Sequence, residues 1–352
     1  MTKKLKIAVA MSGGVDSSVA AQLLKNQGHE VIGIFLHFWK EQEFSGKFEN
    51  KCCSTEALID ARRVADIIGI PLYTLNFSKI FKKQVVDNFL SEYAAGRTPN
   101  PCVVCNKRVK LGELIRRVGE IGFDYVASGH YVKKSGNKLY KAKDQDKDQS
   151  YFLYTFTPGE LKHLLFPLGD YTKDQVRAMA KKYKLPVAEK SDSQEICFIA
   201  EKSHNEFLKR HLKLKPGLIK TIDGKTVGRH AGLPLYTIGQ RKGIEIGGTG
   251  PYYAVKMDYR KNILRAVNER DHESLYKKSF TLKKVNWTVP LPKLPVLCQA
   301  VIRYRHKPVA CRVSRRGKQY AVELKTPQRA ITPGQSAVFY RGRQVLGGGV
   351  IA

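Results

Sequence analysis

The hydrophobic positions at the start of the chain change their period at a pair of glycines. Residues 7–11 form a continuous apolar run, which is typical of a buried strand. From residue 15 apolar side chains recur at one-turn spacing, which predicts a helix. Gly13 and Gly14 separate the two patterns. We therefore expect a strand, a tight turn and a helix within residues 5–25.

The same alternation continues through the N-terminal half of the chain. Apolar runs at residues 31–39, 72–77 and 123–132 predict further strands, and helical patterns at 55–68 and 79–95 lie between them. Strands that alternate with helices predict a doubly wound parallel sheet. Ligands of such sheets bind beyond the carboxyl ends of the strands.

The pattern changes at about residue 205, where short apolar and glycine-rich stretches replace the helical spacing. Asp223-Gly224 predicts the turn of a hairpin, and regularly spaced strands after residue 277 predict a small closed barrel. The fold class we expect is α/β, with a Rossmann-like domain over residues 1–204. A small central β-ribbon domain over 205–276 and a C-terminal β-barrel over 277–352 follow.

The turn between the first strand and the first helix has the composition of an anion-binding loop. Gly13 and Gly14 let the backbone approach a ligand closely, and the N–H groups at a helix start attract an anion. Hydroxyl donors surround the same point at Ser12, Ser17 and Ser18. No lysine occurs within residues 7–24, so the loop is not of the GxxxxGK[ST] type. The alternative is a Gly-Ser turn that merely joins strand to helix.

Charge and hydropathy narrow the class of protein. The chain has 62 Lys and Arg against 31 Asp and Glu, a net charge of +31. Such a surface attracts nucleic acids, although a host proteome with a general lysine bias gives the same excess. No apolar run approaches the ~20 residues of a membrane span, so we expect no membrane partner. The first strand begins near residue 5 and leaves no room for a signal peptide, which favours a cytoplasmic location.

The odd number of cysteines, seven, argues against a disulfide framework. Cys102 and Cys105 form a C-x-x-C pair at the approach to a helix, after two prolines that forbid helix around Asn100. The helix dipole and basic neighbours should lower a thiol pKa there; these neighbours are Lys107, Arg108 and Lys110. Dithiol redox chemistry, metal ligation and chance are the three interpretations of the pair. Cys197 lies in an apolar stretch of the sequence. We expect Cys298 and Cys311 to be core residues of strands, and Cys52 and Cys53 to be ordinary buried or capping thiols.

Several other residues are candidates for ligand binding, and each also has a purely structural interpretation. Leu36 could pack against an adenine ring, or it could simply belong to the core of the sheet. His130 follows Gly129 at the edge of the sheet where ligands bind, and its alternative is a structural histidine whose hydrogen bonds are satisfied within the protein. The segment of Lys147, Asp148 and Gln149 is a polar loop. We expect a set of arginines on alternating strands of the barrel: Arg303, Arg305, Arg312, Arg315 and Arg316. They would form either a phosphate-binding face or a merely solvated face.

SGGVDSS resembles the pyrophosphate loop (PP-loop) of ATP pyrophosphatases, which cleave ATP between its α and β phosphates and adenylate an oxygen. Further motifs follow in a specific order: TPNPCVVCNK, ASGHYV, KDQSYFLY, FPLG, LPVAEKSDSQEICFI, YTIGQRKG and RYR. Together they resemble the bacterial tRNA-specific 2-thiouridylases, which thiolate the wobble uridine. The resemblance runs from about residue 5 to the C-terminus.

The resemblance implies site residues for each ligand. Cys105 is the nucleophile, Cys197 carries a persulfide, and the target base meets Asn100, Pro101 and Cys102. The residues that it implies for ATP binding are Ala10, Met11, Ser12, Gly13, Gly14, Val15, Asp16, Ser17, Ser18, Leu36 and Gly129. Those that it implies for contacts with tRNA are His130, Lys147, Asp148, Gln149, Arg303, Tyr304 and Gln335. Many relatives have aspartate in place of Cys102, so the carboxylate role assigned there does not transfer.

The implied reaction uses ATP with Mg²⁺, tRNA, and a sulfur-delivering protein, which is a cysteine desulfurase or a relay. ATP adenylates the uracil C2 oxygen, and sulfur then displaces AMP. In one scheme Cys105 attacks the persulfide and leaves a Cys105–Cys197 disulfide that a reductant opens. In the other, which the spacing of Cys102 favours, Cys102, Cys105 and Cys197 hold a [4Fe–4S] cluster. The alternatives are another adenylating PP-loop enzyme acting on a different base, or a non-catalytic RNA-binding protein.

Overall fold

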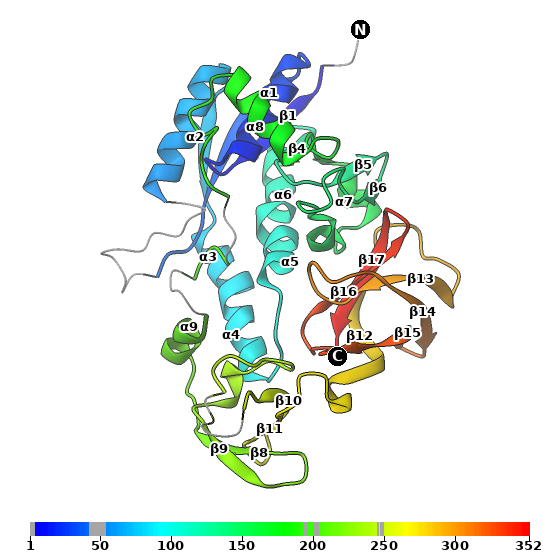
Figure 1. The fold of residues 1–352 in the computed structure, drawn as a ribbon. Helices are drawn as coiled ribbons and strands as arrows, with labels where there is room; N and C mark the ends of the chain where they lie inside the picture. The colour runs from blue at the N-terminus through cyan, green and yellow to red at the C-terminus, as the bar shows by residue number, and fades with distance from the viewer. Residues whose placement is uncertain (1–3, 42–53, 193–195, 200–203, 245, 247–249) are drawn as a thin grey trace.

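The computed structural model describes residues 4–41, 54–192, 196–199, 204–244, 246 and 250–352 (Figure 1). Cys52 and Cys53 lie outside the described residues. The N-terminal domain contains a five-stranded parallel sheet in the order β3-β2-β1-β4-β7. Its strands are β1 (Lys6–Met11), β2 (Glu30–His37), β3 (Leu72–Asn76), β4 (Tyr125–Ser128) and β7 (Leu164–Leu165). The predicted α/β fold with a parallel sheet is confirmed.

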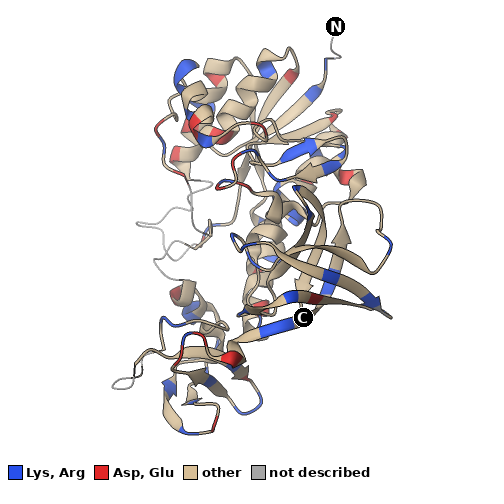
Figure 2. Cartoon of the chain, turned by 45° about the vertical axis from the view of Figure 1, so that its right-hand side comes forward, with Lys and Arg blue, Asp and Glu red and all other residues tan. Residues whose placement is uncertain are grey.

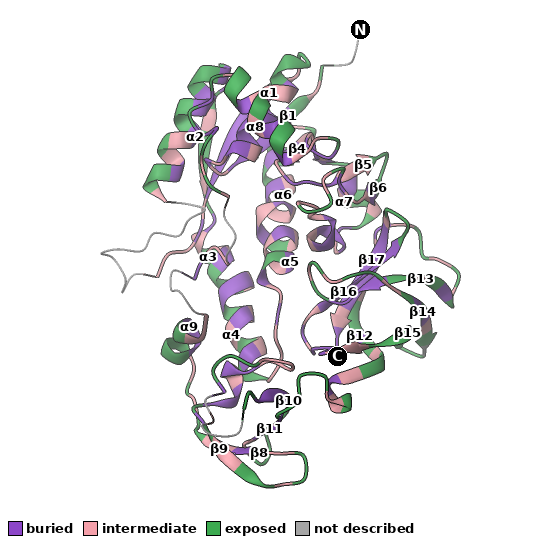
Figure 3. Cartoon of the chain, viewed as in Figure 1, coloured by how far each residue is buried: buried purple, intermediate pink, exposed green. Residues whose placement is uncertain are grey.

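Helices α1 (Val15–Asn26), α2 (Thr55–Ile68) and α8 (Lys173–Lys182) pack together, with α1 in contact with both others. The expected helix at residues 55–68 is confirmed, because Ser54 caps its start and Gly69 adopts the left-handed conformation at its end. Alanines on its buried face let it pack closely on the sheet. Buried residues concentrate in the central strands of this sheet and in the barrel described below (Figure 3).

The helix expected at residues 79–95 has three parts: α3 (Ser78–Phe81), the π-helical turn η2 (Lys82–Val86) and α4 (Asp87–Ala94). A second π-helical turn, η3 (Asn106–Lys110), joins α5 (Pro101–Cys105) to α6 (Gly112–Glu120). The prediction that the C-x-x-C pair only approaches a helix is wrong, since both cysteines lie within α5. Proline is compatible with the first helical position, where its missing N–H removes no bond, and Asn100 caps the helix.

Short elements complete this domain. They are β5 (Lys133–Ser135), β6 (Lys138–Tyr140), the 3₁₀ turn η4 (Ser150–Leu153) and α7 (Pro158–Leu161). The strand expected at residues 123–132 is shorter than predicted, because the chain turns at Gly129 against the start of α1. None of the helices in the described part of the chain is long and apolar enough to cross a membrane.

The central domain follows α9 (His204–His211) and contains a four-stranded sheet in the order β10-β11-β8-β9. Its elements are β8 (Gly217–Lys220), β9 (Thr226–His230), η5 (Leu233–Leu235), β10 (Tyr253–Asp258), β11 (Ile263–Val267) and η6 (Glu273–Leu275). The predicted hairpin is confirmed, since β8 and β9 pair antiparallel and Gly224 takes a φ of +101° in the turn between them.

The C-terminal strands form a sheet that closes on itself through pairing of β12 with β17. They are β12 (Tyr276–Trp287), β13 (Val296–Val301), β14 (Val309–Arg316), β15 (Gln319–Arg329), β16 (Ser336–Arg341) and β17 (Gln344–Ile351). The predicted barrel is confirmed. The β5–β6 hairpin of the N-terminal domain adds to this sheet, with Tyr140 opposite Gln344. The two domains therefore share one hydrogen-bonded sheet.

The arginines of the barrel are placed differently from the prediction. Arg303 and Arg305 lie in the connection between β13 and β14, not on a strand. Arg312, Arg315 and Arg316 all lie on the single strand β14, so the predicted alternation of strands is wrong. That connection turns sharply, and Arg305 itself adopts a φ of +64°. Lys and Arg residues are spread over all three domains in the described part of the chain (Figure 2).

Candidate functional site

The loop after β1 is fixed by close packing against α2. Gly13 has a φ of +68°, and a Cβ there would lie 2.1 Å from the carbonyl oxygen of Ala57. Gly14 is the N-cap of α1 with an ordinary φ, and a Cβ there would meet only the Ser12 hydroxyl, at 3.6 Å. Among the described residues no side chain caps the first turn of α1. The backbone N–H groups of this turn are thus arranged to bind an anion.

The serines of the loop also hold its shape. The Ser17 and Ser18 hydroxyls donate to the Gly14 carbonyl at 3.1 and 2.9 Å, and the Ser12 amide donates to the Ser17 hydroxyl at 3.2 Å. The predicted nucleotide residues Ala10, Met11, Val15, Ser17, Ser18 and Leu36 are all buried. Their part in ATP binding stays a prediction.

Gly129 lies against the same turn from the other side. A Cβ at Gly129 would be 2.6 Å from the Asp16 carbonyl carbon and from the Ser17 nitrogen. The carboxyl end of β4 can therefore approach the first turn of α1 only through a glycine. The structure brings Gly129 and the loop together, as their predicted common role in ATP binding requires.

Asp16 belongs to an ion-pair network that sequence reasoning missed. Lys173, at the start of α8, places its Nζ 2.7 Å from the carboxylate of Asp16 and 2.7 Å from that of Asp192. The Tyr131 hydroxyl donates to Asp16 at 2.8 Å, and burial and this carboxylate raise the pKa of Tyr131. Burial opposes ionisation of Asp192, but bonds from Lys147 and Lys173 hold its pKa below the usual range. No sequence spacing signals this network, because its members lie far apart in the chain.

The C-x-x-C pair lies on one face of α5. The Asn100 side chain accepts from the Val103 amide at 3.3 Å, so it caps the helix. Cys102 is exposed and Cys105 is half-buried against the core. Lys107 donates to both oxygens of Glu160, at 2.5 and 2.6 Å. Its charge is therefore directed to Glu160, and the thiol pKa effect expected from it stays a prediction.

Cys197 is half-buried and its neighbour Phe198 anchors it. The Phe198 ring lies 5.8, 5.4 and 5.6 Å from the rings of Phe81, Phe89 and Phe207. Phe81 and Phe89 flank η2, and α5 packs against η2. The segments of the predicted nucleophile, Cys105, and of the predicted persulfide, Cys197, thus pack around the same turn.

Cys102, Cys105 and Cys197 are thiols rather than members of disulfides. Within the described ranges, no three Cys, His, Asp or Glu side chains gather closely enough to hold a metal ion. The three cysteines therefore do not fit a [4Fe–4S] cluster in this arrangement, and no step of the reaction is assigned to a cluster.

All three domains meet at the segment that leads into α5. The Thr98 amide donates to the Pro333 carbonyl at 2.9 Å, and the Gln335 side chain donates to the Thr98 carbonyl at 2.9 Å. The hydroxyl of Thr98 also bonds that of Thr237, in the central domain, at 3.0 Å. Gln335 thus positions the approach to the C-x-x-C helix, and its predicted contact with tRNA stays a prediction.

The central domain adds a second contact to this segment. The Tyr259 ring lies so close to Gly96 that a Cβ there would be 2.4 Å from it. Gly96 has a φ of +75°, so two independent constraints require glycine at this position.

The other predicted tRNA residues differ in their exposure. His130 is buried with its ring nitrogen 2.8 Å from the Ser128 hydroxyl, and burial, with Lys110 nearby, lowers its pKa well below the ordinary value. Asp148 accepts from the Ala142 amide at 2.9 Å, and Gln149 accepts from the Tyr131 amide at 3.0 Å. Lys147 pairs with Asp192 at 2.7 Å. These residues hold the loop in place, and their contacts with tRNA stay predictions.

Arg303 is exposed, and the Tyr304 ring packs 4.5 Å from Phe152 of the N-terminal domain. The guanidinium of Arg305 lies 5.4 Å from the Tyr304 ring. This connection joins the barrel to the N-terminal domain and leaves Arg303 exposed, and the contact of Arg303 and Tyr304 with tRNA stays a prediction.

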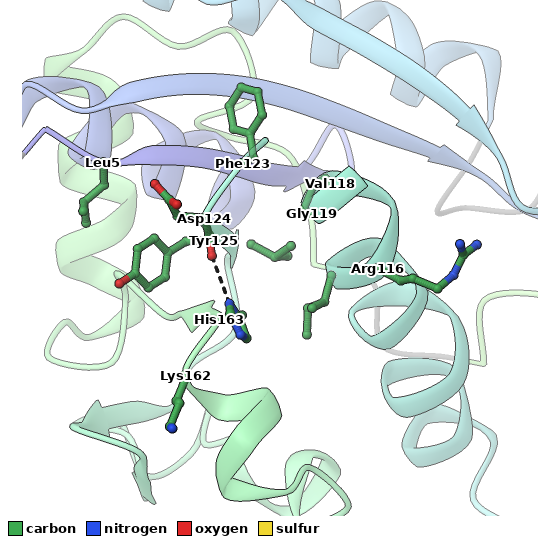
Figure 4. Close-up of a pocket in the computed structure, with 11 residues that line it drawn as sticks. Leu5, Arg116, Val118, Gly119, Phe123, Asp124, Tyr125, Lys162 and His163 are labelled. Carbon is green, nitrogen blue, oxygen red and sulfur yellow. Dashed lines mark hydrogen bonds between the residues drawn. The ribbon is translucent and has the colours of Figure 1, made fainter. Parts of the chain in front are cut away.

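A cavity of about 530 Å³ lies at the opposite edge of the sheet from the loop (Figure 4). Leu5 precedes β1, Tyr125 begins β4 and His163 precedes β7, so the cavity borders the amino ends of the strands. It contains none of the predicted site residues.

Comparison with known proteins agrees with this arrangement. A family model described as the tRNA methyl transferase HUP domain matches residues 5–201. Models described as the tRNA methyl transferase PRC-barrel domain and the aminomethyltransferase beta-barrel domain match residues 205–267 and 277–351. The tRNA-specific 2-thiouridylase MnmA of Moorella thermoacetica is 44% identical over 97% of this chain and 98% of its own. The chain belongs to the tRNA-specific 2-thiouridylase family.

Other relatives are equally similar over their full length. The tRNA-specific 2-thiouridylases MnmA of Carboxydothermus hydrogenoformans and Chloroflexus aurantiacus are 45% and 43% identical, each over 98% of this chain. They align over 97% and 98% of their own lengths. Among solved structures, NMN synthetase from Francisella tularensis aligns with a TM-score of 0.33 at 17% identity, over 54% of this chain and 67% of its own. That likeness is too distant to add to the family assignment.

The two loop glycines should respond differently to alanine. Gly14→Ala meets no protein atom closer than 3.6 Å, so the variant should fold normally but lose nucleotide affinity by about tenfold or more, because its methyl group occupies the ligand's approach. Gly13→Ala should lower the melting temperature, because it collides with α2. Calorimetric titration with ATP and thermal unfolding measure the two effects. Unchanged ATP affinity in Gly14→Ala would show that the nucleotide binds elsewhere.

Proposed function

We propose that this chain is an ATP-dependent tRNA-uridine 2-sulfurtransferase that thiolates the wobble uridine. The observation that carries the proposal is the occurrence, in one domain, of an anion-binding turn at Gly13-Gly14 and of two half-buried thiols, Cys105 and Cys197, whose segments pack around η2. The names of the relatives support the choice of tRNA and of sulfur transfer. We place the reaction in the cytoplasm, where cysteines are kept reduced.

The first step activates the base. ATP enters as its Mg²⁺ complex, and the first turn of α1 binds its pyrophosphate through backbone N–H groups. The uracil C2 oxygen attacks the α-phosphorus, the bond to the β-phosphate oxygen breaks, and pyrophosphate leaves into the loop. The base is then an O-adenylate, whose AMP leaves far more readily than oxygen. The rigid loop keeps the donors in place without reorganisation.

The second step transfers sulfur. A sulfur-delivering protein, either a cysteine desulfurase or a relay, leaves a persulfide on Cys197. The Cys105 thiolate attacks the inner sulfur of this persulfide, a Cys105–Cys197 disulfide forms, and hydrosulfide is expelled. Hydrosulfide attacks C2 of the activated base and AMP leaves with its bonding pair. A dithiol reductant then reduces the disulfide and returns both cysteines to thiols.

Substrate binding has two parts in this proposal. The target base lies against the start of α5, next to Asn100, Pro101 and Cys102, where contacts from the other two domains fix the preceding segment. The body of the tRNA lies on basic surface that includes Arg303, and is bound largely through phosphates. Base recognition and backbone affinity are therefore separate.

The cysteines test the sulfur route directly. Cys105→Ser and Cys197→Ser should abolish 2-thiouridine formation, while Cys102→Asp should retain it without bound iron. Aspartate in the first turn of a helix is favourable, so this variant should fold. Cys298→Ser, in the barrel, is the matched control and should retain full activity. Nucleoside mass spectrometry and iron analysis of anaerobically purified protein measure these outcomes. Loss of both iron and activity in Cys102→Asp would contradict the disulfide route.

Salt dependence tests how tRNA is bound. Affinity should fall steeply with salt, and Arg303→Ala should reduce the slope of log K against log salt concentration by about 0.9 if it neutralises one phosphate. Arg62→Ala, an exposed arginine on α2, is the control and should leave the slope unchanged. Filter binding at several salt concentrations provides the slopes. Equal slopes in wild type and Arg303→Ala would remove Arg303 from the tRNA surface.

A further inference from the structure

Two cysteines of the C-terminal barrel lie side by side on neighbouring strands. Cys298 of β13 is directly opposite Cys311 of β14 in the antiparallel register. Their Sγ atoms are 3.5 Å apart, and the two thiols hydrogen-bond. Opposite residues of an antiparallel pair have Cα atoms about 4.5–5.5 Å apart, which is a separation that a disulfide can span. An S–S bond can therefore form by movement of the two sulfurs while the strands keep their register.

Both thiols point to the interior of the barrel. The adjacent pair on the same strands, Leu297 and Arg312, is exposed, with Leu297 at 74%, and successive residues of a strand face opposite sides. Cys311 belongs to the hydrophobic core of the barrel, and Cys298 packs against that core. The two cysteines of the proposed sulfur route pack against a different core, which contains the parallel sheet. The barrel pair is therefore separate from that route.

The two thiols of the pair are not equivalent. Cys298 is half-buried, whereas Cys311 is only 6% exposed, so a small reagent reaches Cys298 more readily. The hydrogen bond with Cys311 lowers the pKa of Cys298, burial opposes this effect, and the charge of Arg341 adds to it. The same hydrogen bond and burial raise the pKa of Cys311. Because the thiolate is the nucleophile, Cys298 is suited to react first.

We propose that Cys298 and Cys311 form a reversible disulfide, which a low-molecular-weight disulfide closes and a dithiol reductant opens. The Cys298 thiolate attacks one sulfur of the small disulfide, the S–S bond of that molecule breaks, and one small thiolate leaves. Cys311 then attacks the Cys298 sulfur of the mixed disulfide, and the second small thiolate leaves. Each protein thiol gives up one proton and each departing thiolate takes one up. The protein pair is oxidised by two electrons, and the small disulfide is reduced to two thiols.

The disulfide would close a ring around the connection that carries Arg303. This ring contains residues 298–311, which are the end of β13, the connection and the start of β14. It includes Tyr304, whose ring packs 4.5 Å from Phe152 of the N-terminal domain. A cross-link restricts the open and unfolded forms of the residues within it, so the oxidised strands should separate less readily. In a reducing compartment the pair is a dithiol, and its disulfide marks exposure to an oxidant.

Peptide mass spectrometry and hydrogen exchange test the proposal on the folded, full-length protein. After incubation with oxidised glutathione, free thiols are blocked with iodoacetamide and the protein is digested without reductant. A peptide linked through Cys298 and Cys311 should appear, and dithiothreitol added to the folded protein before blocking should remove it. In the linked protein, amide exchange in β13 and β14 should slow by about tenfold or more.

Two kinds of variant control for the other cysteines. Cys298→Ser should lose both the linked peptide and the change in exchange, and its half-buried position should tolerate the hydroxyl. A variant with serine at the five remaining cysteine positions, 52, 53, 102, 105 and 197, keeps the barrel pair. It should form the linked peptide and slow its exchange as the wild type does, because no other thiol takes part in the proposed steps.

Three results would overturn the proposal. The first is wild-type protein that carries only a mixed disulfide with glutathione at Cys298, or no modification there at all. The second is a linked peptide that dithiothreitol does not remove from the folded protein. The third is a linked protein whose exchange in β13 and β14 equals that of the reduced protein. None of these results depends on whether the protein forms 2-thiouridine, so failure of the proposed function is distinguishable.

Discussion

The structure depends on the absence of side-chain atoms at two glycines that surround the first turn of α1. Gly13 lies against the backbone of α2, and Gly129 brings the end of β4 against the Asp16–Ser17 peptide. Both contacts are too close for a Cβ, so the position of the loop is set by backbone packing of three elements. A site built in this way presents its N–H groups without reorganisation when an anion arrives. The proposed adenylation would use that rigidity to hold the departing pyrophosphate.

The position of the C-x-x-C helix depends on the segment between α4 and α5. It bonds to the barrel through Thr98, Pro333 and Gln335, and packs on the central domain at Gly96. In the proposed function, a tRNA bound on the barrel would contact the domain that fixes the backbone before Asn100 and the C-x-x-C pair. The β5–β6 hairpin, which joins the barrel sheet, reinforces this union of domains. The barrel and the segment before the C-x-x-C helix are therefore joined by direct hydrogen bonds.

Features of this architecture that depend on neighbouring residues could be predicted from the sequence. The period change at Gly13-Gly14, the capped helix at 55–68 and the turn at Gly224 each follow from residues within one element. The π-helical turns could not be predicted, because no spacing of apolar residues signals them. In η3 a Cβ at Gly112 would lie 1.9 Å from the carbonyl oxygen of Lys107, five residues earlier. The joining of β6 to β17 pairs residues about two hundred positions apart.

In the candidate site, too, some features could be predicted from the sequence and others depend on the fold. Motif order identified the loop and the cysteines, but the partners of Asp16 lie on β4's exit and on α8, and only the fold brings them together. Gln335 and His130 show the converse. Their motif positions suggest ligand contacts, whereas in the described structure Gln335 bonds to protein backbone and His130 is buried beside Ser128. Sequence reasoning locates a site more readily than it divides residues between binding the ligand and supporting those that do.

The central claim is that this chain places sulfur on the wobble uridine of tRNA. Its most direct test is mass spectrometry of nucleosides from tRNA of a strain that lacks the protein, beside the parent strain and one with the gene restored. The account predicts that the 2-thiolated wobble uridine disappears in the deletion strain and returns on restoration. An undiminished level of this nucleoside in the deletion strain, or a loss of thiolation at a different base, would contradict it.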